Sequence, residues 1–229
     1  LYGKKIIKFN PNNPYLTDRD IFILSKGHAA AALYAVLANV GFFSKRKLLE
    51  YGSDNSNFMA HASHKVPGVE FSTGSLGHGL PIACGLAVAK KRKKLSNYIY
   101  VINSDGEMAE GSNWEAILFA SHHKLDNLIL IIDYNKLQSF DSVENTLGIE
   151  PMKDKFLSFG WNVYEIDGHN FKSIEQVLLT CKSSKGKPKC IIANTLKGKG
   201  ISFMENKVEW HYKNPNKIQF DQAVKELTL

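Results

Sequence analysis

The sequence predicts an α/β fold, a doubly wound, mainly parallel sheet with helices on both faces. Two short, continuous apolar runs, at 98–103 and 128–133, are typical of strands that are buried on both faces of such a sheet. Around them lie segments whose apolar residues recur at the spacing of one helix face. Because strands and helices alternate along the chain, these patterns favour a doubly wound sheet.

The other elements follow from the same patterns. Apolar residues at helical spacing predict helices over 33–40, 80–88 and 174–181. Ser112, followed three residues later by Glu115, is a candidate N-cap with its capping-box partner and predicts that a further helix begins there. Two weaker strand patterns and a flexible loop are expected at 162–167, 189–194 and 197–200.

The last part of the chain has a simpler pattern. From residue 205 onward we expect an extended passage and then one short helix. No repeat, low-complexity tract or linker interrupts the sequence, so we expect one domain over residues 1–229.

Composition excludes several classes of protein. The chain has 229 residues, of which 44% are hydrophobic and 22% charged, so it can bury a sizeable core and is not expected to be disordered. No apolar run approaches the ~20 residues that span a bilayer, so we expect no membrane association. The first ten residues lack the apolar stretch of a signal peptide, and the three cysteines have no metal-binding spacing. A reducing, cytoplasmic location is therefore expected.

The net charge of +7 leaves two interpretations open. The densest basic run, Lys90–Lys94, has the charge of a nucleic-acid patch. It also has the composition of a solvated helix end, where lysines interact favourably with the helix dipole. No aromatic residues are interleaved with the lysines, so we favour the helix end and expect no nucleic-acid partner.

Oxygen-bearing side chains follow two of the expected strands. Asp105 comes after the first strand, and Asn135 follows it by 30 residues, the length of one strand–helix–strand crossover. Ligands of open parallel sheets bind beyond the carboxyl ends of the strands. Carboxylate and amide oxygens suit Mg²⁺ or Ca²⁺, and Mg²⁺ commonly shares its shell with substrate phosphates. The spacing is thus compatible with a magnesium–diphosphate clamp, and equally with two ordinary polar turns.

The usual nucleotide-binding motifs are absent. The chain has no G-x-x-x-x-G-K-[ST] motif, and the glycines at 74, 77 and 79 do not form G-x-G-x-x-G. A diphosphate would therefore have to be bound by a motif other than these two.

Ser104-Asp-Gly106 followed by Asn135 resembles the thiamine diphosphate motif, and much more of the chain is similar to the transketolase family. The similarity lies in that family's amino-terminal, diphosphate-binding portion, and it is strongest to the split transketolases, whose two halves are separate chains. The matching stretches occur in family order at 10–14, 18–20, 24–28, 67–70, 72–77, 110–115, 122–127, 135–138, 159–161, 167–169, 197–200 and 203–206. The resemblance implies the thiamine diphosphate-binding fold.

The resemblance also assigns the metal and diphosphate ligands. Asp105, Asn135 and the Leu137 carbonyl would be the protein ligands of Mg²⁺, for which Ca²⁺ can substitute. Gly106 would present its amide to the diphosphate, and its neighbour Glu107 is counted with the cofactor-binding residues. The backbone that embraces the aminopyrimidine would come from Gly74, Ser75 and Leu76.

Four side chains match catalytic positions of the family. His28 resembles a histidine beside the diphosphate and thiazolium, and His211 one near the diphosphate and the substrate entrance. His61 resembles a histidine that binds the donor's hydroxyls, although His64 competes for that role. Glu110 resembles a glutamate that couples paired sites across a dimer. Neutral imidazoles suit proton transfer and hydroxyl recognition near pH 7.

Thiamine diphosphate-dependent transfer of a two-carbon ketol unit, from a ketose phosphate to an aldose phosphate, is the activity that the resemblance implies. The family's first amino-terminal segment, with a further active-site histidine, has no counterpart here. The family's pyrimidine-binding domain also has no counterpart here. That domain carries the glutamate that activates the cofactor and the arginines that bind substrate phosphate. We therefore expect activity only with a partner subunit that supplies this domain, in an α₂β₂-type assembly.

Two alternatives remain open from the sequence. The chain could be a non-catalytic structural or regulatory subunit of the same fold, which the missing first segment and Ser139, at a commonly apolar position, favour. It could also be another thiamine diphosphate enzyme, such as a deoxyxylulose phosphate synthase or a two-chain keto-acid dehydrogenase. The length of the transketolase-like match argues against the second alternative.

Overall fold

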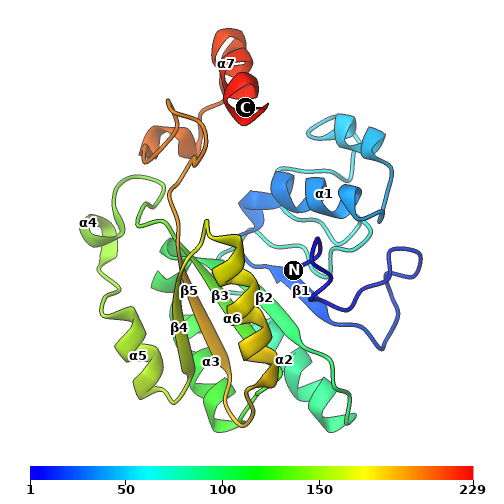
Figure 1. The fold of residues 1–229 in the computed structure, drawn as a ribbon, viewed down its shortest axis with the longest axis vertical. Coiled ribbons are helices and arrows are strands. Elements are labelled where there is room, and N and C mark those ends of the chain that lie inside the picture. The colour runs from blue at the N-terminus through cyan, green and yellow to red at the C-terminus, as the bar shows by residue number, and fades with distance from the viewer. Residues whose placement is uncertain (229) are drawn as a thin grey trace.

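Five parallel strands form one twisted sheet, in the order β1-β2-β3-β5-β4 (Figure 1), in the computed structural model, which describes residues 1–228. The strands are β1 Ile21–Leu24, β2 Ile99–Ser104, β3 Leu128–Tyr134, β4 Asn162–Asp167 and β5 Lys189–Asn194. The helices are α1 Ala30–Asn39, α2 Gly79–Arg92, α3 Gly111–His122, α4 Val143–Leu147, α5 Met152–Ser158, α6 Phe171–Ser183 and α7 Lys217–Thr228. The predicted fold class is confirmed.

Both faces of the sheet are covered, because alternate strand residues point to opposite sides. Ile99 and Val101 of β2 belong to a core that α2, α3 and α5 complete. Tyr100 of the same strand belongs to a second core, which α1 and α6 complete with Leu37 and Leu178. A strand that is apolar on both sides can be buried only between two layers of helices, which explains the continuous apolar runs in the sequence.

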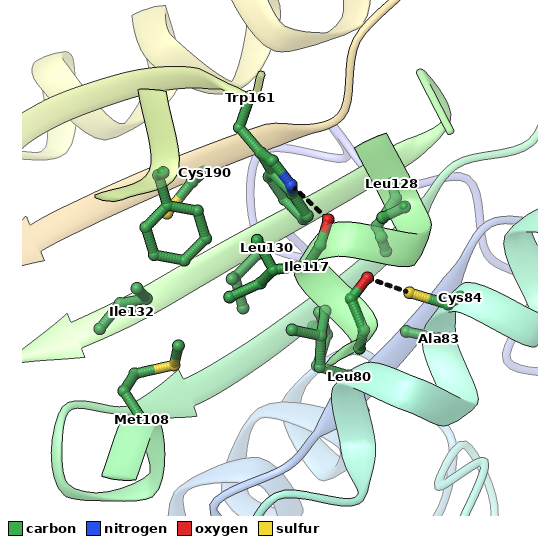
Figure 2. Close-up of a cluster of buried hydrophobic side chains, with 14 of the residues drawn as sticks. Leu80, Ala83, Cys84, Met108, Ile117, Leu128, Leu130, Ile132, Trp161 and Cys190 are labelled. Carbon is green, nitrogen blue, oxygen red and sulfur yellow. Dashed lines mark hydrogen bonds between the residues drawn. The ribbon is translucent and has the colours of Figure 1, made fainter. Parts of the chain in front are cut away.

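The core between the sheet and α3 is organised around Trp161. Trp161 is 1% exposed, and its Nε1–H donates to the Ile117 carbonyl at 2.9 Å. Figure 2 shows this hydrogen bond as a dashed line. The Phe156 ring meets the Trp161 ring edge-on at 5.4 Å between centroids. One side chain thus links α5, the start of β4 and α3.

The observed elements differ from the prediction in four places. β1 was not predicted, nor were the short helices α4 and α5. The Ser112 N-cap prediction is wrong, because α3 begins at Gly111 with Glu110 as its N-cap. The Ser112 hydroxyl donates instead to the Gly77 carbonyl at 2.7 Å, so it joins two segments rather than capping its own helix.

The basic run lies at the end of α2. Lys90 donates to the Thr17 carbonyl, and Lys91 pairs with Asp126 at 2.8 Å. Lysines in the last turn of a helix interact favourably with its dipole. These contacts agree with the interpretation of the basic run as the end of a helix.

Among the described residues, no helix combines the length and the apolar character needed to cross a bilayer.

Gly77 joins the segment before α2 to the start of α3, and alanine should not be tolerated there. Its φ is +82°, and an added Cβ would lie 2.6 Å from Glu110 Cβ. The left-handed backbone and the overpacking together predict a loss of about 2–4 kcal/mol in the free energy of unfolding, measured by urea denaturation. Gly85→Ala is the matched control, because a Cβ within α2 meets nothing at this position and should be neutral or stabilising. Equal effects of the two substitutions would contradict the argument.

Candidate functional site

The carboxyl ends of β2 and β3 lie side by side. Ser104 is the register partner of Asp133, and the Asp105 amide donates to the Asp133 carbonyl at 3.3 Å. The Asp105 carboxylate accepts a hydrogen bond of 2.6 Å from the amide of Lys136, the residue after Asn135. The predicted adjacency of the two strand ends is therefore confirmed.

A second segment reaches the same edge from β1. The chain leaves β1 through Ser25 and enters a 3₁₀ helix, Gly27–Ala29, that carries His28. The loop that carries His61 and Gly74 is fastened to β1 because the Thr73 hydroxyl donates to the Leu24 carbonyl at 2.6 Å. A Cβ at Gly27 would lie 2.4 Å from the Thr73 carbonyl oxygen, so this close approach requires glycine.

The third segment follows β5. The amide of Asn206 donates to the Lys197 carbonyl at 2.9 Å and closes a compact loop. His211 ends the 3₁₀ helix Val208–His211, and its Nδ1 lies 3.3 Å from Lys197 Nζ. The rings of His211 and His28 are 5.4 Å apart between centroids. Residues far apart in the sequence therefore meet at one edge of the sheet.

These segments enclose a polar cavity of about 460 Å³. We call it the strand-end cavity. Its lining includes most of the predicted site residues, namely His28, His61, Gly74, Leu76, Asp105, Gly106, Asn135, Leu137 and His211. The structure thus brings together the side chains that the family resemblance selected.

Three predicted residues lie outside this lining. Ser75 and Glu110 are exposed. Glu107 is fully buried, and its carboxylate accepts hydrogen bonds from the Ser25 hydroxyl and the Gly77 amide. Glu107 therefore braces the segments that form the cavity. His64, the competitor of His61, is exposed and bonded to Ser72.

Two cavity lysines were missed by the sequence reasoning. Lys26 and Lys197 both line the strand-end cavity, and the Lys26 ammonium pairs with Asp133, which also accepts a hydrogen bond from Thr195. Their positions inside Ser-Lys-Gly-His and Lys-Gly-Lys-Gly were the available signal. The cavity has five further lining residues that the sequence analysis did not predict: Ala29, Ser104, Gln138, Ser139 and Tyr212.

The electrostatics of the cavity favour an anionic ligand. Lys26 and Lys197 supply positive charge. Burial lowers the pKa of His28 to about 4, and the charge of Lys26 acts in the same direction. Burial also lowers the pKa of His211, followed by the charge of Lys197. Both imidazoles are therefore neutral at pH 7, and each offers one donor and one acceptor nitrogen.

The donor set fits a hard divalent cation. Asp105, Asn135 and the Leu137 carbonyl supply only oxygen, and a cation of this kind usually completes its shell with water and phosphate. Burial raises the pKa of Asp105 to about 6, which a bound cation would offset. Nowhere in residues 1–228 do three or more His, Cys, Asp or Glu side chains cluster around a possible metal position. The expected ligand set contains only one side chain of these four types, Asp105, so it is compatible with the absence of such a cluster.

A second cavity, of about 510 Å³, opens over the face of the sheet between α1 and α6. It is lined mainly by apolar side chains such as Leu33, Ile131 and Leu178, and it meets the strand-end cavity at Lys26 and Ala29. Because its walls offer few hydrogen-bond donors, it is unsuited to a diphosphate.

Comparison with known proteins identifies the family. Residues 1–223 match the family described as "Transketolase, thiamine diphosphate binding domain". The chain is 43% identical to an apulose-4-phosphate transketolase subunit of Actinobacillus succinogenes, over 97% of this chain and 81% of that protein. It is 40% identical to the 6-deoxy-6-sulfo-D-fructose transketolase subunit SqwG of a Clostridium species, over 97% of this chain and 82% of that protein.

A solved structure agrees with these relatives. The transketolase of Campylobacter jejuni superposes with a TM-score of 0.94 at 32% identity, over 100% of this chain and 37% of that one. This chain therefore spans little more than a third of that transketolase. The match of nearly every residue to one family, together with the fold and the strand-end cavity, shows that the chain belongs to the transketolase family, within its thiamine diphosphate binding domain.

Proposed function

We propose that this chain is the amino-terminal subunit of a two-chain transketolase, which transfers a two-carbon ketol unit between sugar phosphates with thiamine diphosphate and Mg²⁺. The observation that carries the proposal is the adjacency of Asp105 to the Asn135–Leu137 segment, inside a cavity lined by lysines and histidines. The relatives that are named as transketolase subunits support the two-chain organisation. We treat residues 1–229 as one diphosphate-binding domain.

The oxygen ligands and the charged groups of the cavity have separate tasks in this proposal. Asp105, Asn135 and the Leu137 carbonyl hold the cation, and the amide of Gly106 and the ammonium groups of Lys26 and Lys197 receive the diphosphate. When bound, thiamine diphosphate supplies a carbanion sink for cleavage of the ketose carbon–carbon bond.

The remaining predicted residues act on the organic part of the ligands. His28, as a neutral imidazole, and His61 exchange hydrogen bonds and protons with substrate hydroxyls. The backbone of Gly74–Leu76 contacts the aminopyrimidine. The two glutamates do not contact the ligands in this proposal. Glu107 holds the segments of Ser25 and Gly77 together, and Glu110 faces the partner chain.

A partner chain completes the site in this proposal. It would carry the pyrimidine-binding domain, and the assembly would be of the α₂β₂ type. Leu118 and Phe119 on α3 are 58% and 42% exposed, which suits an interface. The three cysteines are free, in keeping with a reducing, cytoplasmic compartment.

Mixing the purified chain with a carboxy-terminal transketolase subunit should restore ketol transfer that neither chain shows alone. The assay is ketose consumption with a sugar phosphate acceptor, thiamine diphosphate and Mg²⁺, and a chelator should remove the activity. Full turnover by the isolated chain would refute the requirement for a partner. Assembly with cofactor binding but no turnover, for every donor and acceptor pair tried, would favour the non-catalytic alternative.

A further inference from the structure

The two ring nitrogens of His211 have different surroundings. Nδ1 lies 3.3 Å from Lys197 Nζ. Nε2 makes no hydrogen bond to any residue in the described range 1–228, and His211 lines the strand-end cavity. The two nitrogens of an imidazole point in divergent directions, so the nitrogen that Lys197 does not contact is the one left for a ligand.

Lys197 is held in place by its own loop. Its carbonyl accepts the Asn206 amide at 2.9 Å, and its side chain is partly buried. Gly198 follows with a φ of +73°, and an added Cβ there would lie 2.7 Å from the Met204 carbonyl oxygen. The backbone of the loop is therefore closed on itself, and it places the Lys197 side chain beside His211.

The chemistry of the pair allows one arrangement of protons. A lysine ammonium has three donors and no acceptor, so His211 Nδ1 must accept with its lone pair. A neutral imidazole that accepts at Nδ1 carries its proton on Nε2. The other titratable groups near the ring are Lys26, His28 and Tyr212, whose ring lies 4.8 Å from that of His211 between centroids. In the described structure neither a carboxylate nor the Tyr212 hydroxyl is bonded to the imidazole, so no hydrogen-bond acceptor favours a proton on Nδ1.

We propose that Lys197 is a positioning residue that fixes His211 in the tautomer with its proton on Nε2, so that His211 meets the ligand as a hydrogen-bond donor and not as a base. The tautomer of His211 does not depend on the proposed function. The further statement that the Nε2–H donates to a diphosphate or sugar oxygen rests on that function. In this arrangement His211 binds anionic or hydroxyl oxygen, and proton removal falls to other groups such as His28.

The test is nuclear magnetic resonance of the 229-residue chain labelled with ¹⁵N-histidine. Long-range proton–nitrogen correlation distinguishes the two neutral tautomers, and His211→Gln identifies the His211 signals. The wild-type chain at pH 8, without any ligand, should show His211 as the single tautomer protonated at Nε2. In Lys197→Met both tautomers should be populated, and the pKa of His211 should rise towards its ordinary value because a neighbouring positive charge has been removed.

Two further variants make the result specific. Lys199→Met removes a lysine of the same loop whose side chain is 56% exposed, and it should leave the His211 signals unchanged. Lys197→Arg keeps a donor and should restore the Nε2 tautomer. A wild-type signal from the Nδ1–H tautomer would overturn the proposal, as would a Lys197→Met chain with unchanged tautomer and pKa. If Lys197→Met loses the fold, the wild-type and Lys197→Arg spectra decide alone. Because no cofactor is added, failure of the proposed function would leave these spectra unaffected.

Discussion

Asp105→Asn should lower the affinity of the assembled complex for Mg²⁺ and thiamine diphosphate by about 100-fold or more. Asp105 provides the carboxylate in the expected ligand set, and residues that merely orient metal ligands already change metal affinity about 10–100-fold when they are replaced. Asparagine retains the size of the side chain, but its one acceptor oxygen can serve only one of the two amides, of Gly106 and Lys136, that bond to the two separate carboxylate oxygens. The measurement is calorimetric titration of thiamine diphosphate into the complex in the presence of Mg²⁺.

Two comparisons separate the loss of the metal ligand from a general loss of structure. Asp154→Asn, an exposed carboxylate in the first turn of α5, should bind the cofactor as the wild type does. The Asp105→Asn chain without cofactor should still unfold cooperatively, at a lower temperature than the wild type because one buried amide loses its acceptor, a cost of about 1–3 kcal/mol. Wild-type affinity in Asp105→Asn would remove the cation site from the proposed function.

The sequence predicted those parts of the site that depend on strand ends. Apolar runs identified β2 and β3, and parallel strands end at the same edge of a sheet, so the spacing was compatible with the adjacency of Asp105 and Asn135, which the strand register confirms. β1 was missed because its four apolar residues, Ile21–Leu24, are too few to show a period. The histidines were identified by family resemblance, and no spacing rule would have found them.

Side-chain directions and ion pairs could not be predicted from the sequence. Glu107 lies two residues from Asp105, but the intervening 3₁₀ turn directs it inward to the Ser25 hydroxyl, away from the cavity. Lys26 and Lys197 lie in stretches that match the family, but charge and spacing do not distinguish them from the other lysines among 29 basic residues. Their ion pair and hydrogen bond, with Asp133 and His211, are tertiary contacts between segments more than ten residues apart.

Trp161→Ala should lower the free energy of unfolding by about 4 kcal/mol, the largest effect on stability that we expect from a single side chain. Trp161 is 1% exposed, and its indole packs edge-on against Phe156. The indole also donates to the Ile117 carbonyl, a hydrogen bond that Figure 2 shows. Alanine would leave a large cavity between α3, α5 and the sheet, and such cavities collapse only partly. Urea denaturation should show a lower midpoint.

Trp161→Phe separates the two contributions of the indole. Phenylalanine retains most of the packing and loses the donor, so its cost should be about 1–2 kcal/mol. Phe171→Ala removes a side chain that is 83% exposed and should change stability by less than about 0.5 kcal/mol. Equal losses for Trp161→Ala and Phe171→Ala would contradict the packing argument. Since Trp161 precedes β4, at the amino end of a parallel strand, it lies at the end of the sheet opposite the strand-end cavity. Cofactor affinity of the folded Trp161→Phe complex should therefore equal that of the wild type, so stability and binding can be changed independently in this fold.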